Sequence, residues 1–192
     1  MTTMTPITRQ DAGRRSFDIV IRVCHWTTVL LILVLGASGY LAHAVPSLAR
    51  GLLPWHRSAG VCLWLITLLR LAWRWTYARL PPFPAAMSRL HRWVVRTSEY
   101  ALYGLLLAQP LSGLASSIAL GHAFSLFGIK VPKLVAPDLP LFETLHELHE
   151  KGALVLAVMI AGHASAALVH HYILRDDTLR AMMRSSRPIT LK

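Results

Sequence analysis

An apolar segment near the C-terminal end carries two histidines at a spacing that strongly constrains the fold. The segment from His146 to Tyr172 holds His149 and His163, fourteen residues apart, and it has no Asp, Glu, Lys or Arg after Lys151. Fourteen residues of α-helix make close to four turns and rise about 21 Å, so both imidazoles share one helix face. A bilayer core is about 30 Å thick, and imidazole is a good ligand for haem iron. The segment predicts a membrane helix with a haem ligand near each bilayer face.

Three further apolar segments are long enough to cross a bilayer. Hydrophobic residues make up 54% of the 192-residue chain and charged residues 15%, yet the net charge is +11. This combination is unusual for a soluble protein and typical of a small membrane protein with basic cytoplasmic ends. The sequence therefore predicts an all-α, integral membrane four-helix bundle, one domain over residues 1–192. We expect its helices at about 17–44, 55–76, 92–120 and 143–174.

The segments between the expected helices are short or rich in proline. We expect a turn at 46–54, a proline-stiffened loop at 79–84, a basic amphipathic lead-in to the third helix at 89–96 and a longer loop at 121–141. Pro110 predicts a kink in the third helix. A basic tail ends the chain. Residues 1–17 lack an apolar core followed by a cleavage site, so we expect no cleaved signal peptide.

Basic residues are distributed unequally between the two sides of such a bundle. Four spans place both termini on one side, and fifteen of the twenty Lys and Arg residues fall on that side. The positive-inside rule then predicts cytoplasmic termini. A nucleic-acid binder can be equally basic, but it does not have apolar runs of this length, so we expect no nucleic-acid partner.

Depth sorts the histidines in the spans into two pairs. His25 and His163 lie towards the cytoplasmic side, and His56 and His149 towards the outer side. We expect each pair to ligate the iron of one haem, because the crossed pairs would join opposite faces. No Cys-x-x-Cys-His occurs, so such haems are held non-covalently. The two cysteines are expected to be packing residues.

Each of these assignments has an alternative reading. A histidine in a span is often a hydrogen-bonded contact between helices. His170 lies near the cytoplasmic surface, where it is either a contact for a quinone head group or propionate, or an interfacial residue. His146-Glu147-Leu148-His149 lacks the His-Glu-x-x-His spacing of a zinc peptidase. Gly60, Gly152 and Gly162 lie near the ligand candidates, where they leave space for a macrocycle or pack helices.

Several basic residues have candidate roles towards anions. Guanidinium groups suit carboxylates, so arginines near the histidines are candidates to bind haem propionates. These are Arg57, Arg70 and Arg74. Four basic residues on the outer side are candidates to attract a small anion such as superoxide. They are Arg50, Arg57, Lys130 and Lys133. The alternative is that they anchor loops among lipid head groups.

The order of several short motifs resembles that of the bacterial cytochrome b561 family over nearly the whole chain. The motifs are Cys24-His25-Trp26, Trp55-His56-Arg57-Ser58-Ala59-Gly60, Pro81-Pro82, Gln109-Pro110-Leu111-Ser112-Gly113, Phe127-Gly128-Ile129-Lys130-Val131-Pro132, Leu148-His149-Glu150, Gly162-His163-Ala164, His170-His171-Tyr172 and Asp176-Asp177-Thr178-Leu179. The resemblance implies a four-helix bundle in the bacterial inner membrane, with two b haems bound by the histidine pairs above. It also implies electron transfer between the ubiquinone pool and a partner at the outer (periplasmic) face.

One branch of that family looks like a superoxide oxidase that reduces ubiquinone, so the resemblance favours an oxidoreductase. In that branch the histidine matching His170 and a lysine in the loop after the second helix lie near the quinone. Here the loop from Pro81 to Arg89 has no lysine, which is a departure from the branch. The alternatives are a cytochrome b anchor subunit that relays electrons from a separate dehydrogenase, and a haem-free membrane scaffold or transporter.

Overall fold

The computed structural model describes residues 17–78, 87–176 and 178–183, and four long helices dominate it. They are α2 (Ile19–Ala44), α3 (Pro46–Thr76), α4 (Arg89–Ala119) and α5 (Leu139–Tyr172). Each of the four is long and apolar enough to cross a membrane. The prediction of an all-α integral membrane bundle is therefore confirmed. The expected loop at 79–84, residues 1–16 and the end of the basic tail lie outside the described residues.

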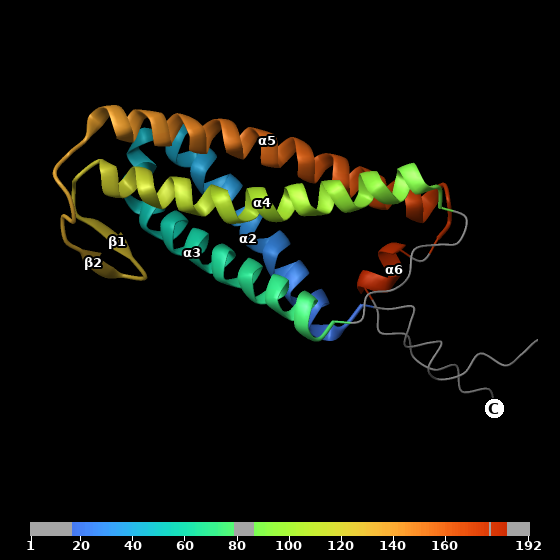
Figure 1. Cartoon of the computed structure of the whole chain (residues 1–192). Helices are drawn as coiled ribbons and strands as arrows, with labels where there is room; N and C mark the ends of the chain where they lie inside the picture. Colours follow the sequence, from blue (N-terminus) through green and yellow to red (C-terminus); the bar gives the residue numbers. More distant parts are fainter. Residues whose placement is uncertain (1–16, 79–86, 177, 184–192) are drawn as a thin grey trace, which may run out of the picture.

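The four helices are arranged as two antiparallel pairs that cross each other. Figure 1 shows α2 beside α3 and α4 beside α5. A hairpin of β1 (Phe124–Leu126) and β2 (Ile129–Val131) lies at one end, which we call the hairpin end. The short helix α6 (Thr178–Met183) lies at the other end, which we call the terminus end. There the backbone N–H of Phe17 donates to the carbonyl of Ala181 at 3.2 Å, so both described ends of the chain lie on the same side.

Side-chain caps fix where three of these helices begin. Asp18 accepts from the N–H of Val20 at 2.7 Å, Ser88 from that of His91 at 3.2 Å, and Asp138 from that of Leu141 at 3.1 Å. Such caps satisfy N–H groups that have no partner within the helix. The cap at Ser88 starts α4 at Arg89, so the basic lead-in that we expected before the third helix is its first turns.

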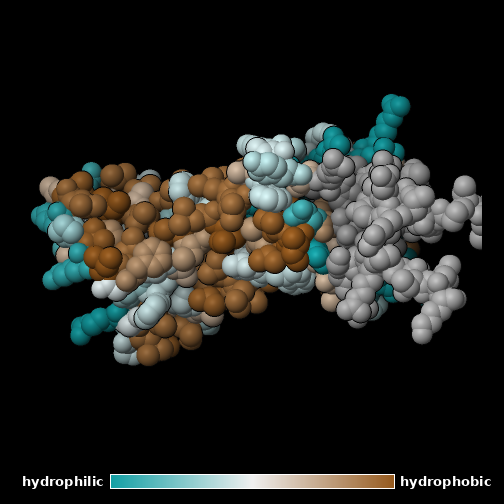
Figure 2. Space-filling view, turned by 90° about the horizontal axis from the view of Figure 1, so that it is seen from below, coloured by the Kyte–Doolittle hydropathy of each residue, from teal (hydrophilic) through white to brown (hydrophobic). Residues whose placement is uncertain are grey.

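The interior of the bundle is a small leucine layer, and most of the apolar surface faces outwards. Leu63, Leu106 and Leu156 are buried together, one each from α3, α4 and α5. Large apolar residues elsewhere on the helices are exposed, such as Leu33 at 65% and Leu154 at 68%. Figure 2 shows apolar residues over much of the bundle, with hydrophilic residues gathered towards its ends. In a membrane, lipid tails cover such a surface, so it does not need to be buried within the protein.

Two expected connections are wrong. The residues predicted as a turn at 46–54 belong to α3, which begins at Pro46 and contains Pro54. Proline is favoured in the first turn of a helix because its missing N–H has no partner there. For the same reason α5 begins at Leu139, before Pro140, instead of at about 143. Pro110 lies inside α4.

The expected loop at 121–141 contains the β-hairpin, which sequence reasoning missed. Leu126 pairs with Ile129 around a two-residue turn in which Phe127 and Gly128 have φ of 52° and 77°. Positive φ at both positions is the signature of a tight hairpin turn whose twist matches that of the strands. The N–H of Phe127 donates to Ser58 Oγ of α3 at 2.8 Å, so the hairpin is fixed to the bundle.

Candidate functional site

The structure brings the four histidines from the spans together as two facing pairs. The rings of His56 in α3 and His149 in α5 have centroids 6.2 Å apart at an interplanar angle of 82°. We call them the hairpin-side pair. The rings of His25 in α2 and His163 in α5 have centroids 6.4 Å apart at 65°. We call them the terminus-side pair. These are the two pairings that the depth argument predicts.

The donor set of each pair suits a metal that brings other ligands with it. Metal–nitrogen bonds to imidazole are about 2 Å long, so centroids just over 6 Å apart leave room for one metal ion between the rings. A structural zinc ion needs four protein ligands. Within the described parts of the chain, no group of three or more His, Cys, Asp or Glu residues is placed to hold a metal. A haem iron has four ligands from the macrocycle and needs only two imidazoles, so it fits both pairs.

Hydrogen bonds to Nδ1 fix the orientation of both rings in the hairpin-side pair. His56 Nδ1 lies 3.0 Å from Ser38 Oγ, and this hydroxyl donates to the carbonyl of Leu35 at 3.2 Å. His149 Nδ1 donates to the carbonyl of Gln109 at 3.0 Å, and this carbonyl also accepts from Ser112 Oγ at 2.9 Å. In the tautomer in which Nδ1 donates to these oxygens, Nε2 has its lone pair available for a metal.

A Ser-Gly dipeptide faces each ring of this pair. Ser38-Gly39 on α2 meets His56, and Ser112-Gly113 on α4 meets His149. A Cβ added to Gly39 would lie 3.2 Å from His56 Cε1, and one added to Gly113 would lie 2.8 Å from His149 Cε1. Any side chain at Gly113 would displace the ring, so glycine is required there.

The glycines that sequence reasoning singled out do not contact the rings. A Cβ on Gly60 would meet Pro110 and Leu35 at ordinary distances, and one on Gly162 would meet nothing within 4 Å. At Gly152 the clash is with Gln109 Oε1. Gly39 and Gly113 were missed because they lie on helices other than those of the rings they contact. Spacing along one helix carries no signal for such a contact.

The terminus-side pair has different surroundings, which include an arginine side chain. His25 Nδ1 is buried with no hydrogen-bond partner among the described residues. The guanidinium of Arg70 lies close enough to interact electrostatically with both His25 and His163. Its Cζ lies 5.4 Å from the ring centroid of Tyr103, and its Nε is buried without a partner in the described chain.

Two of the three arginines considered for propionates have other partners. Arg74 donates through Nη1 and Nη2 to the Glu99 carboxylate at 2.5 and 2.8 Å. Arg57 donates through Nε to Ser117 Oγ at 3.0 Å, and its Cζ lies 5.6 Å from the centroid of Phe124 in the hairpin. Of the three, only the Arg70 guanidinium has no hydrogen bond or ion pair among the described residues.

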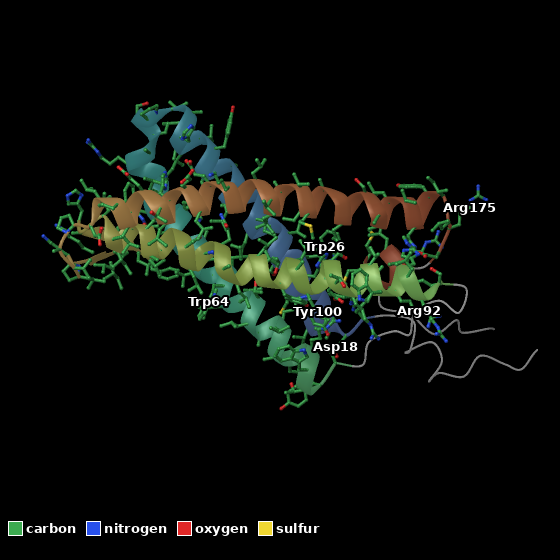
Figure 3. All side chains as sticks on the ribbon, turned by 45° about the horizontal axis from the view of Figure 1, so that its top comes forward. Asp18, Trp26, Trp64, Arg92, Tyr100 and Arg175 are labelled. Carbon is green, nitrogen blue, oxygen red and sulfur yellow. The ribbon has the colours of Figure 1, made fainter. Side chains whose placement is uncertain are left out.

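His170 is joined to the segment that follows α5. Its Nδ1 lies 2.5 Å from Asp176 Oδ2, and the ring of His91 lies 5.3 Å away. Burial alone would raise the pKa of the Asp176 carboxyl, but hydrogen bonds from His170 and Thr178 outweigh it and hold this pKa below its ordinary value. A hollow of about 420 Å³ adjoins the pair at the terminus end, where Figure 3 also shows Arg92 and Arg175. His171, Tyr172, Arg175, Asp176 and Arg180 line it.

The basic residues of the hairpin end fall into two groups. Arg50, Lys130 and Lys133 are exposed, whereas Arg57 is partly buried in the contacts given above. Lys151 is paired with Glu147 at 2.6 Å. His146 and His43 lie 3.4 and 3.8 Å from Glu150, so both are surface residues on this side. Three exposed cations therefore remain as candidates to attract an anion.

Comparison with known proteins agrees with the motif-based resemblance. The family model described as "Prokaryotic cytochrome b561" matches residues 16–185. The chain is 32% identical over 169 residues to "Cytochrome b561 homolog 1" of Escherichia coli (strain K12), covering 83% of this chain and 92% of that relative. It is 29% identical over 167 residues to "Probable superoxide oxidase CybB" of Yersinia pestis, covering 85% and 93%. It is also 29% identical over 181 residues to "Cytochrome b561 homolog 2" of Escherichia coli (strain K12), covering 88% and 92%.

Proposed function

Because this chain belongs to the prokaryotic cytochrome b561 family, we propose that it binds two b-type haems, one at each histidine pair. Membership itself makes it a multi-pass inner-membrane cytochrome b that takes part in electron transfer. The observation that carries the proposal is the presence of two facing imidazole pairs, fourteen residues apart along α5. A bound haem supplies a one-electron iron couple, and the protein sets its position and surroundings.

In this proposal His56 and His149 are the axial ligands at the hairpin end, and His25 and His163 those at the terminus end. Ser38 and Gln109 hold the first two rings with Nε2 available, and Gly39 and Gly113 give them room. The leucine layer separates the two sites and excludes water between them. Its member Leu156 lies seven residues from each histidine of α5, about 10 Å along the helix axis.

We place the terminus end in the cytoplasm, so the hairpin end faces the periplasm. Electrons then pass between an outer-face donor and the membrane quinone pool. His170 is the candidate contact for ubiquinone, because its partner Asp176 lines the hollow at the terminus end. Superoxide is the candidate donor, supported by the exposed Arg50, Lys130 and Lys133 and by the similarity to a probable superoxide oxidase. In that case the protein is an oxidoreductase.

A reduced-minus-oxidised spectrum of the purified protein, together with a haem assay per chain, tests this proposal. We expect a sharp α-band of bis-histidine b haem and two haems per chain. Absence of haem from the purified protein would favour the alternative of a haem-free scaffold or transporter. A single haem per chain would remove electron passage between two sites.

A further inference from the structure

The surroundings of the two histidine pairs differ in a way that sets a direction for electrons. At the hairpin-side pair both Nδ1 atoms have oxygen partners, whereas at the terminus-side pair His25 Nδ1 has none among the described residues and Arg70 acts electrostatically on both rings. We propose that Arg70 makes the terminus-side pair the site of higher reduction potential, so that electrons run from the hairpin end to the terminus end. This inference rests on the proposed function, because it requires a haem at each pair.

Arg70 occupies on α3 the position that a second histidine would take. It follows His56 by fourteen residues, as His163 follows His149 on α5. Fourteen residues make about four turns, so Arg70 lies on the same face of α3 as His56 and about 21 Å further along the axis. The electrostatic interaction of Arg70 with both His25 and His163 agrees with this placement. At this level α2 supplies the facing histidine, and α3 supplies a cation.

The charge of Arg70 is not balanced by an acidic residue in the described chain. Glu99 also acts on His163, but its carboxylate is held by Arg74 in a two-point ion pair. The face of the Tyr103 ring stabilises the guanidinium without neutralising it. Among Arg70, Arg74 and Glu99, the charges therefore sum to one positive charge.

The hairpin-side pair has no such excess. Arg57 acts on His56, and His149 is influenced by His146 and, with the opposite sign, by Glu150. The hydrogen bonds from Nδ1 to Ser38 and to the Gln109 carbonyl make both rings more basic ligands. A more basic ligand favours the oxidised metal. A nearby cation favours the reduced metal, and its effect is larger in a medium of low dielectric constant.

Both differences therefore act in the same direction. A haem held by His56 and His149 would give up the electron, and a haem held by His25 and His163 would accept it. No proton or bond is exchanged in this step. Arg70 thus raises the reduction potential at the terminus-side pair through its charge, without ligating the metal.

Spectroelectrochemical titration of single-site variants in detergent measures the effect. His56→Ala leaves the terminus-side pair intact, and His163→Ala leaves the hairpin-side pair intact, so each potential is assigned to its site. We expect His56→Ala, which keeps the terminus-side pair, to have a higher reduction potential than His163→Ala. In that background Arg70→Gln is expected to lower the reduction potential by at least 59 mV. This shift corresponds to a tenfold change in the equilibrium constant of a one-electron couple. Arg70→Lys keeps the charge and is expected to retain most of the difference.

Arg92→Gln is the matched control, because it removes one exposed arginine near the same end of the bundle and is expected to leave the potential unchanged. A higher potential at the hairpin-side pair would overturn the inference, as would an Arg70→Gln potential equal to its parent. The latter would mean that a haem propionate neutralises Arg70. If Arg70→Gln loses its haem, the inference is tested by comparing the potentials of His56→Ala and His163→Ala alone. It is contradicted if His163→Ala has the higher potential. Failure of the unmutated chain to bind two haems would instead contradict the proposed function.

Discussion

The imidazole of His149 lies against the backbone of Gly113, where α5 meets α4. A Cβ at Gly113 would lie 2.8 Å from Cε1 and 2.9 Å from Nδ1 of that ring. Real Cβ atoms do not approach other atoms so closely, so the ring keeps its place only while residue 113 is glycine. The neighbouring Ser112 and Gln109 hold the same ring from the polar side. The orientation of His149 is therefore set by α4 as much as by its own helix.

Gly113→Ala is expected to displace His149 and weaken haem binding at the hairpin-side pair. Overpacking of this kind costs about 1–3 kcal/mol. The change should appear as an α-band of about half the usual intensity, with the terminus-side haem retained. Gly104→Ala on the same helix is the control, because its Cβ would meet nothing within 4 Å. Equal haem content in the two variants would show that the contact does not matter for binding.

The helices and the pairing of histidines were predictable because both follow from spacing along the chain. Apolar runs gave the spans, and the fourteen-residue interval on α5 fixed two depths. The start of α3 was not predictable from two prolines read as a turn, because proline at the first helical position is compatible with a helix. The hairpin was hidden in a segment whose turn depends on positive φ at Phe127 as well as at Gly128.

The contacts that orient the rings were not predictable, because they join different helices. Ser38 and Gly39 contact a ring on α3, and Gln109 and Gly113 contact a ring on α5. Arg70 and Arg74 look alike in the sequence, one helical turn apart. Only the structure pairs Arg74 with Glu99 and leaves Arg70 beside the terminus-side histidines.

His170→Ala is expected to keep both haems and to slow quinone exchange, since the proposed quinone contact lies at the terminus end. Turnover with a soluble quinone analogue measures this, and haem content checks that the bundle is intact. His171→Ala, at the neighbouring position, tests the hollow itself, because His171 lines the hollow whereas His170 contacts it only through Asp176. Unchanged turnover in His170→Ala would make this histidine an interfacial residue.

Asp176→Asn is expected to loosen α6 at the terminus end. The carboxylate accepts from His170 and from the N–H of Thr178, the first residue of α6. Because the pKa of Asp176 is lowered in the folded protein, its contribution is present above the ordinary value of 3.8 and is lost only as pH falls through the lowered one. At pH 7 the variant should therefore exchange the amide hydrogens of Thr178–Met183 faster than the unmutated chain. Equal exchange rates would contradict a role for this contact.

Lys130→Gln with Lys133→Gln is expected to slow the reduction of haem by superoxide. Both lysines are exposed at the hairpin end, where they would raise the association rate of an anion. Exposed charges are screened over about 10 Å at 0.1 M salt, so the rate in the unmutated chain should also fall as salt rises. Stopped-flow absorbance measures both effects, with unchanged haem spectra as the control. A slow reduction rate that changes neither with salt nor with the two substitutions would exclude electrostatic attraction of superoxide.

A reporter fused after residue 192 is expected to be cytoplasmic. Fifteen of the twenty basic residues lie on the side of the termini. The two described ends are hydrogen-bonded to each other, so one reporter determines the side of the membrane for both ends. A periplasmic signal would reverse the sides assigned to the two histidine pairs.

The haem content of single histidine variants tests the central claim most directly. His25→Ala, His56→Ala, His149→Ala and His163→Ala should each bind one haem per chain where the unmutated protein binds two. His25→Ala combined with His163→Ala should also bind one, because both changes affect the same site, whereas His25→Ala combined with His56→Ala should bind none. Two haems in any single variant, or one haem in the last combination, would contradict the assignment of the pairs.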